Sequence, residues 1–277
     1  MPEGDAIFRT ARTLQRALAG RTVTRFESVL PALTRVHDDA PITGRVVERV
    51  EAAGKHVLMR FSGGLTLRTH MRMSGSWHIY RPGERWQRPR RDMRVVVATD
   101  AFEAIAFNVP VAEFLDERDE ARHRELRALG PDLLGETFDE TEALRRMRSH
   151  DNDAIADVLL NQRVAAGIGN VYKSEVLFVQ GTSPFALVRD LDDERLRSIL
   201  QTARRLLIAN VTMLDAAITT YIGYRRGTGR DESQRRYVYG RARKPCRKCD
   251  TLIRVQPQGP HVRLTYWCPR CQPIPHP

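Results

Sequence analysis

Four cysteines near the C-terminus place the strongest constraint on how this chain folds. They form two pairs, Cys246-x2-Cys249 and Cys268-x2-Cys271, separated by 18 residues, and they are the only cysteines among the 277 residues. Two such pairs are typical of a tetrahedral zinc site, because each pair forms a tight knuckle that turns two thiolates toward one ion. Four protein ligands leave no open coordination position, so we expect a structural Zn²⁺ rather than a catalytic one. The alternative is four reduced cysteines without a metal.

The segment between the two cysteine pairs predicts a β-hairpin. Its sequence, TLIRVQPQGPHVRLTYW, reads as strand, turn and strand. Arg263 falls near the turn on the second strand, where a guanidinium could reach a phosphate. On charge and spacing alone, a solvated strand arginine is the alternative.

The charge of the chain indicates a polyanionic partner. The formal net charge is +11 and the pI is near 10.1. Residues 225–271 hold 13 basic and 3 acidic residues, so most of the excess lies in the last fifth of the chain. Only four of the basic residues are lysines and 41 are arginines. The guanidinium of arginine can bind a phosphate through two N–H groups, which suits a polyanionic partner. A coding bias toward arginine is the alternative explanation of this count.

The sequence has no apolar run of 18 residues, so we expect no transmembrane helix. The first 20 residues carry acidic residues early and arginines within, unlike a signal peptide. We therefore expect a cytoplasmic protein.

Two regions differ in their hydrophobic pattern. Residues 2–20 have helical spacing, and residues 21–110 alternate apolar and polar residues, as in the half-buried strands of a two-layer antiparallel sheet. An acidic stretch from Glu113 to Arg146 predicts a linker into a second domain, and residues 141–222 predict helices.

Two of these predicted helices are joined by a short turn that holds Gly167, Gly169 and Asn170. A helix pair of this kind is a DNA-binding shape, and the start of its second helix suits a phosphate. Asn170 could donate to that phosphate or simply cap the helix.

The N-terminus offers an unusual nucleophile. Removal of Met1 would leave Pro2 with a free secondary amine, and an α-amino group has a pKa of about 7.7–8.0. Attack of a secondary amine on an aldehydic carbon gives an iminium, an electron sink, and Glu3 could move protons at a sugar oxygen. Alternatively, Pro2 only begins a helix. Lys55, after Gly54 and before a strand, is either a turn lysine or an ammonium fixed over a phosphate.

Taken together, these features resemble the formamidopyrimidine-DNA glycosylase and endonuclease VIII family of base-excision repair. The matching motifs cover nearly the whole chain in order: PEGD at 2–5, GKH at 54–56, THMRMSGSW at 69–77, LLNQRVAAGIGNVY at 159–172 and CRKC…RLTYWCPRCQ ending at Gln272.

The resemblance implies a role for each site residue. Pro2 would attack C1′ of a damaged nucleotide flipped from the duplex, and Glu3 would handle protons. Lys55, Asn170 and Arg263 would contact phosphates. Met73, with Arg72 beside it, would enter the gap left by the flipped nucleotide. Elimination from the iminium would then cut the strand on both sides of the sugar.

The chain departs from the family at two places. Ala6 stands where the family usually carries a second glutamate, so the role of that carboxylate is either absent or taken by another group such as Asp5. The Arg-x-Phe pair of the formamidopyrimidine branch is not evident within residues 106–114. Because PEG at 2–4 is closer to the endonuclease VIII branch, we expect oxidised pyrimidines and abasic sites as substrates.

We therefore predict an α+β fold. It comprises an N-terminal two-layer antiparallel β-sandwich with flanking helices over 1–122, a helix–two-turn–helix domain over 123–236 and a four-cysteine zinc finger over 237–277. The expected function is a bifunctional DNA glycosylase and abasic-site lyase acting by β,δ-elimination, monomeric, with damaged duplex DNA as its partner at the nucleoid. The rivals are a non-catalytic zinc protein that binds damaged DNA, which Ala6 favours, and an RNA-binding protein.

Overall fold

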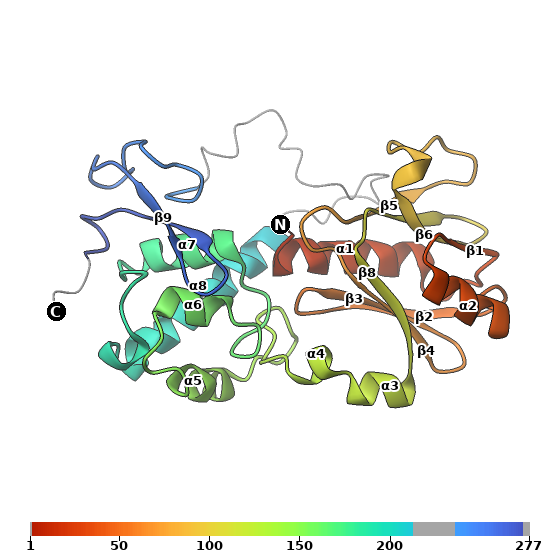
Figure 1. Cartoon of the computed structure of the whole chain (residues 1–277), viewed down its shortest axis with the longest axis horizontal. Coiled ribbons are helices and arrows are strands. Elements are labelled where there is room, and N and C mark those ends of the chain that lie inside the picture. The colour runs from red at the N-terminus through yellow and green to blue at the C-terminus, as the bar shows by residue number, and fades with distance from the viewer. Residues whose placement is uncertain (1, 213–235, 274–277) are drawn as a thin grey trace. The chain divides into compact units, whose positions relative to one another are not determined.

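The structure is a computed structural model, and it describes residues 2–212 and 236–273 (Figure 1). The chain divides into two compact units, one of residues 2–127 and one of residues 128–212 with 236–273, counted over the described residues. The finer division into three domains, with boundaries after 122 and 236, stays a prediction. Some of the sequence predictions fall on residues that the structure does not describe. These are the removal of Met1, the end of the predicted helical region from residue 213 and the start of the basic segment up to residue 235.

The first unit is the predicted antiparallel sandwich. One sheet has the strand order β1-β6-β7-β5 and the other β2-β3-β4-β8, and every pairing is antiparallel. The strands are β1 (Arg25–Ser28), β2 (Val47–Ala53), β3 (His56–Phe61), β4 (Leu65–His70), β5 (Ser76–Tyr80), β6 (Met93–Ala98), β7 (Glu103–Phe107) and β8 (Val111–Asp116).

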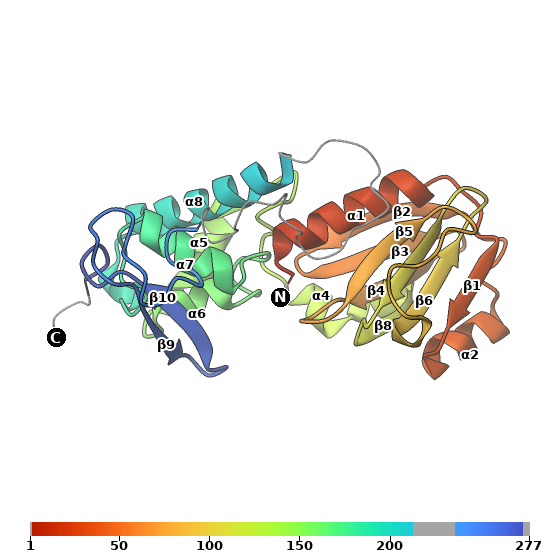
Figure 2. The same cartoon turned by 90° about the horizontal axis from the view of Figure 1, so that it is seen from above.

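The core of this unit lies between the two sheets and under α1 (Gly4–Leu18), which runs along β2 and β3 (Figure 2). The helical spacing in the sequence buries one face of α1, with Ile7, Ala11, Leu14 and Leu18 all inside the core. The opposite face of the first sheet is also covered, because the segment 81–92 folds over it and packs Trp86 against Phe107.

Two elements of this unit differ from the sequence predictions. Strand β8 occupies residues where an acidic linker was expected to begin, since pairing with β4 makes this stretch an integral strand. The helix α2 (Pro31–Asp39) was not predicted, because Leu33 is its only buried residue. The short elements η1 (Arg90–Asp92), α3 (Glu117–Arg122) and α4 (Arg124–Arg127) complete the unit.

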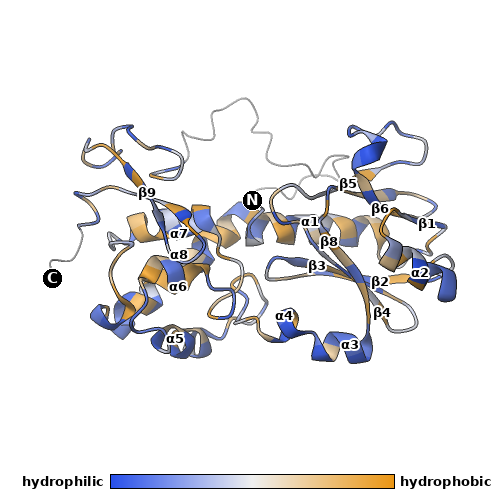
Figure 3. Ribbon diagram, viewed as in Figure 1, coloured by the Kyte–Doolittle hydropathy of each residue, from blue (hydrophilic) through white to orange (hydrophobic). Residues whose placement is uncertain are grey.

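The second unit is helical and carries the β-hairpin. Its elements are α5 (Glu140–Arg148), α6 (Ile155–Leu160), α7 (Asn170–Val179), η2 (Val188–Asp190), α8 (Asp193–Thr212), β9 (Arg254–Gln258) and β10 (Arg263–Trp267). Hydrophobic residues dominate α6, whereas α3 and α5 are largely hydrophilic (Figure 3). The helices share one buried core, and a second, small core lies between α7 and the cysteine hairpin. Of the described helices, none combines the length and the hydrophobicity that crossing a membrane would need.

Candidate functional site

Pro2 and Glu3 lie directly before α1. Glu3 is the N-cap residue of this helix, and its backbone carbonyl accepts a hydrogen bond from the Ile7 N–H at 3.0 Å. Glu3 is buried, whereas Pro2 is half-buried. The positive end of the helix dipole favours a carboxylate at this position. The fold therefore holds an acid next to the expected amine, and Pro2 precedes the helix rather than forming its first turn.

The carboxylate of Asp5, beside Ala6, is already engaged. Asp5 is only 2% exposed and forms an ion pair with Arg9 at 3.5 Å, one helical turn away. A part for Asp5 in place of the missing glutamate stays a prediction.

Lys55 lies in the turn between β2 and β3, after Gly54, whose φ is +57°. It is buried, and it precedes His56, which pairs across the sheet with His70 at the end of β4. The two imidazoles meet edge to face with ring centroids 4.7 Å apart. Burial, together with the nearby charge of Arg68, lowers the pKa of His56 to about 2 and that of His70 to about 4. At neutral pH both histidines are therefore uncharged.

Met73, the predicted wedge residue, lies in the tight turn between β4 and β5. The Gly75 N–H donates to the Met71 carbonyl at 2.8 Å, which closes the turn. Met73 lies in this turn with 62% of its surface exposed. Arg72 is exposed and takes a left-handed backbone conformation with φ of 45°.

Asn170 and Arg263, predicted as phosphate contacts from distant parts of the sequence, are brought together in the second unit. Arg263 is the exposed first residue of β10, and the Asn170 Nδ2 donates to the carbonyl of the next residue, Leu264, at 2.8 Å. The alternative role of Asn170 as a cap is wrong, since Gly169 is the N-cap of α7. The amide of Asn170 instead binds the hairpin.

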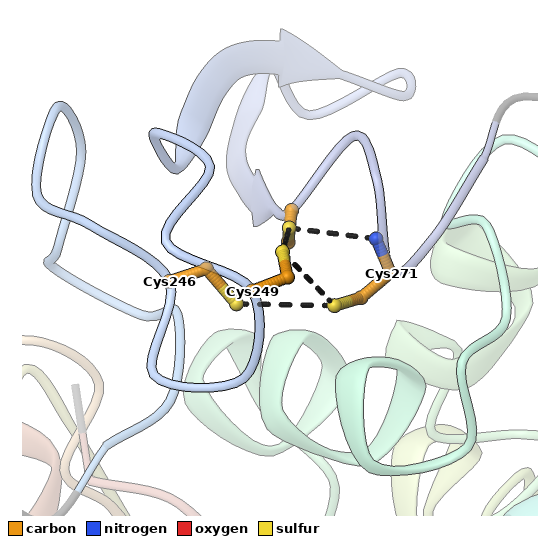
Figure 4. Close-up of side chains that lie close together, drawn as sticks. Cys246, Cys249 and Cys271 are labelled. Carbon is orange, nitrogen blue, oxygen red and sulfur yellow. Dashed lines mark hydrogen bonds between the residues drawn. The ribbon is translucent and has the colours of Figure 1, made fainter.

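The four cysteines converge as their spacing predicts. Their sulfur atoms lie within 4.8 Å of one another, and the separations include 3.4 Å for Cys249–Cys268 and 3.9 Å for Cys246–Cys271 (Figure 4). Zn–S bonds of about 2.3 Å in a tetrahedron place sulfurs about 3.8 Å apart, so the donor set and its size fit Zn²⁺. The Lys248 N–H points to Cys246 Sγ, and the Cys271 N–H to Cys268 Sγ, as expected of two knuckles.

Two charged residues on α7 were not among the candidates predicted from the sequence. Lys173 is 1% exposed and donates to Thr265 Oγ1 at 2.8 Å. Glu175 accepts hydrogen bonds from three consecutive backbone N–H groups, at Tyr237, Val238 and Tyr239, over 2.7–2.9 Å. The only signal in the sequence was their position inside an otherwise apolar helix, NVYKSEVLFV.

Comparisons with known proteins identify the family of this chain. Residues 1–122 match the family model of the formamidopyrimidine-DNA glycosylase N-terminal domain, and residues 129–221 match that of its H2TH domain. The chain is 42% identical over 280 residues to the Streptomyces coelicolor protein named "Probable endonuclease 8 2", covering 100% of this chain and 96% of that protein. It is 38% identical over 275 residues to "DNA-(apurinic or apyrimidinic site) lyase Nei2" of Mycolicibacterium smegmatis, with 98% and 99% covered.

A solved structure supports the fold. The Lactococcus lactis Fpg, in complex with DNA containing an abasic site, superposes with a TM-score of 0.82 at 21% identity, covering 99% of this chain and 100% of that one. Family models match most of the chain, and the full-length relatives include proteins named endonuclease 8. The chain therefore belongs to the formamidopyrimidine-DNA glycosylase family and is most similar to its endonuclease VIII branch.

Proposed function

We propose that this protein is a DNA glycosylase and abasic-site lyase of base-excision repair. The observation that carries the proposal is the Pro2–Glu3 start, held at the head of a buried helix in a chain that aligns over its full length with lyase relatives. A protein that only binds DNA has no need of a terminal secondary amine beside a buried acid.

The chemistry follows from these two groups. The Pro2 nitrogen attacks C1′ of the lesion nucleotide, and the damaged base leaves with the electrons of the glycosidic bond and a proton. Glu3 gives and takes protons at the sugar oxygen, which opens the ring to an iminium between the Pro2 nitrogen and C1′. The iminium accepts the electrons released when C2′ loses a proton, and the 3′ phosphate departs. A second elimination expels the 5′ phosphate, so both strand ends carry phosphate.

The favoured substrates are oxidised pyrimidines, such as thymine glycol and dihydrouracil, and abasic sites. Support comes from the PEG start and from the full-length relatives named endonuclease 8. The substrate form is duplex DNA, with the lesion nucleotide flipped out because its C1′ is inaccessible in the stack. Met73 fills the gap, with Arg72 beside it, and Lys55, Asn170 and Arg263 hold phosphates.

The metal is one Zn²⁺ held by Cys246, Cys249, Cys268 and Cys271. With four thiolates it has no open position for substrate, so its contribution is to hold the two knuckles and hence the hairpin that carries Arg263. We propose a monomer that acts on chromosomal DNA in the cytoplasm.

Borohydride trapping tests the proposal. Purified protein is incubated with a labelled duplex carrying an abasic site and reduced, and the products are separated on a denaturing gel beside Pro2→Ala. We expect a covalent band in the parent and none in the variant. No band, from protein that starts at Pro2 by mass spectrometry, would instead favour the non-catalytic binder.

A further inference from the structure

Two side chains on one face of α7 hold strand β10 immediately after Arg263. Asn170 and Lys173 are three residues apart and therefore lie on the same side of the helix. Asn170 Nδ2 binds the Leu264 carbonyl at 2.8 Å, and Lys173 Nζ binds Thr265 Oγ1 at the same distance. The helix thus holds the two residues that follow Arg263 in sequence.

Lys173 is an unusual choice for an internal contact. At 1% exposure it is the most buried lysine or arginine among those that the structure describes, and Thr265 is 0% exposed. Burying an ammonium is unfavourable unless charge and hydrogen bonds compensate it, so removal of a compensating contact is costly. An apolar side chain of similar length would pack there without that cost.

The other strand of the hairpin is held from α6. Asp157, at a half-buried position, accepts a hydrogen bond from Gln258, the residue paired across the hairpin with Arg263. The Lys173 charge lowers the pKa of Asp157, although burial outweighs it and the net shift is upward. Gly259 lies so close that a Cβ there would come within 2.1 Å of Asp157 Oδ1. Both strands are therefore fixed to the helices within two residues of Arg263.

We propose that Lys173 is a positioning residue for DNA binding: through Thr265 it fixes Arg263 beside Asn170, so that a phosphate meets two donors already in place. This inference rests on the proposed function, in which Arg263 and Asn170 contact phosphate. Lys173 itself is enclosed by protein and acts through the hairpin. Preorganisation of this kind improves binding because the hairpin does not have to be ordered when DNA arrives.

The test measures binding to a duplex with a tetrahydrofuran abasic analogue, which has no aldehyde carbon and is not cleaved. Lys173→Met removes the ammonium and keeps the stem, and Thr265→Val removes only the acceptor oxygen. Thr265→Ser keeps that oxygen and is the matched control. Arg263→Gln, alone and combined with Lys173→Met, completes a double-mutant cycle. Bound zinc and melting temperature report whether each variant is folded.

We expect Lys173→Met and Thr265→Val to weaken binding about fivefold or more, and Thr265→Ser to bind like the parent. The slope of log affinity against log salt should fall by about 0.9, the loss of one phosphate contact. In the Arg263→Gln background, Lys173→Met should have no further effect. The strand-cleavage rate at saturating protein, on a true abasic site, should stay within about twofold of the parent.

Parent-like binding by Lys173→Met and Thr265→Val overturns the inference. The inference is also overturned if Lys173→Met weakens binding as much in the Arg263→Gln background as it does in the parent. If Lys173→Met loses zinc or melts early, the comparison of Thr265→Val with Thr265→Ser decides. A parent protein that does not bind this duplex overturns the proposed function instead, which separates the two failures.

Discussion

The backbone N–H of Arg72 donates a hydrogen bond to Nδ1 of His70 at 3.1 Å. The lowered pKa of the imidazole, about 4, keeps the ring neutral at neutral pH, and this bond requires the single ring proton to be on Nε2. The turn that carries Met73 is thus fastened to a neutral histidine at the end of β4. Protonation of that ring would place a new Nδ1–H of His70 against the backbone N–H of Arg72.

Acid should therefore destabilise the first unit well before its carboxylates titrate. His56 and His70 have folded-state pKa values of about 2 and 4, below their ordinary 6.5. Between pH 6.5 and 4 the unfolded chain gains protons that the folded protein does not. The free energy of unfolding should fall by up to about 1.4 kcal/mol per pH unit for each histidine.

Urea unfolding between pH 7.5 and 5 measures this slope. His70→Asn, whose side-chain oxygen can still accept from the Arg72 N–H, should reduce the slope by the contribution of one proton. A free energy of unfolding that is the same at pH 7.5 and pH 5 would contradict the neutral-histidine assignment.

Much of this fold could be predicted because its hydrophobic periodicity is local. Ile7, Ala11, Leu14 and Leu18 mark α1 by spacing alone, and the cysteine spacing predicts the four-sulfur cluster. Strand β8 was missed because its acidic composition looks like a linker until β4 supplies the pairing partner. Such a strand is defined by its partner rather than by its own sequence.

Lys173 could not be predicted for a related reason. A lysine ordinarily indicates a solvated surface, and its acceptor, Thr265, lies 92 residues further along the chain. The same holds for Glu175, whose partners begin at Tyr237. The family resemblance supplied roles for Pro2, Glu3 and Arg263 that burial and contacts alone do not assign.

Met73→Ala should separate stability from function. Because the side chain is 62% exposed, its loss should change the free energy of unfolding by no more than about 0.5 kcal/mol. If Met73 is the proposed wedge, excision of a base from duplex DNA should slow, since the side chain that would fill the gap is shortened. Single-turnover rates on a duplex and on the same lesion in single-stranded DNA make the comparison, and an equal loss on both would argue against a wedge.

Gly75→Ala should disturb the same turn from within. An added Cβ would lie 2.6 Å from the Met71 carbonyl oxygen and 3.1 Å from the Val109 Cα, both of them backbone atoms that cannot rotate away. We expect a loss of about 1–3 kcal/mol in the free energy of unfolding. Gly83→Ala is a useful control, because no atom lies within 4 Å of a Cβ there, although its φ of +80° carries a cost of its own. Equal losses for both variants would mean that backbone conformation, rather than crowding, is responsible.

Glu175→Gln should loosen the segment that leads into the cysteine hairpin. The carboxylate holds three backbone N–H groups, and an amide offers one acceptor oxygen and a donor that faces them. We expect a loss of about 1–3 kcal/mol in local stability. Amide hydrogen exchange at Tyr237, Val238 and Tyr239 reads this directly, and unchanged protection there would show that the carboxylate is dispensable.

Removal of the metal should unfold the hairpin and spare the sandwich. The core between α7 and the hairpin contains few residues, among them Cys246 and Cys268 themselves, whereas the sandwich has a large core of its own.

Trp267, buried on β10 against Phe185 with ring centroids 4.9 Å apart, reports on the hairpin. A chelator or Cys268→Ser should shift its emission to longer wavelength, and Trp267→Phe should abolish that shift. The urea midpoint of the sandwich, followed at its buried Trp77, should not move, because none of its described core residues belongs to the hairpin. A common loss of both signals would instead mean that the two units unfold as one.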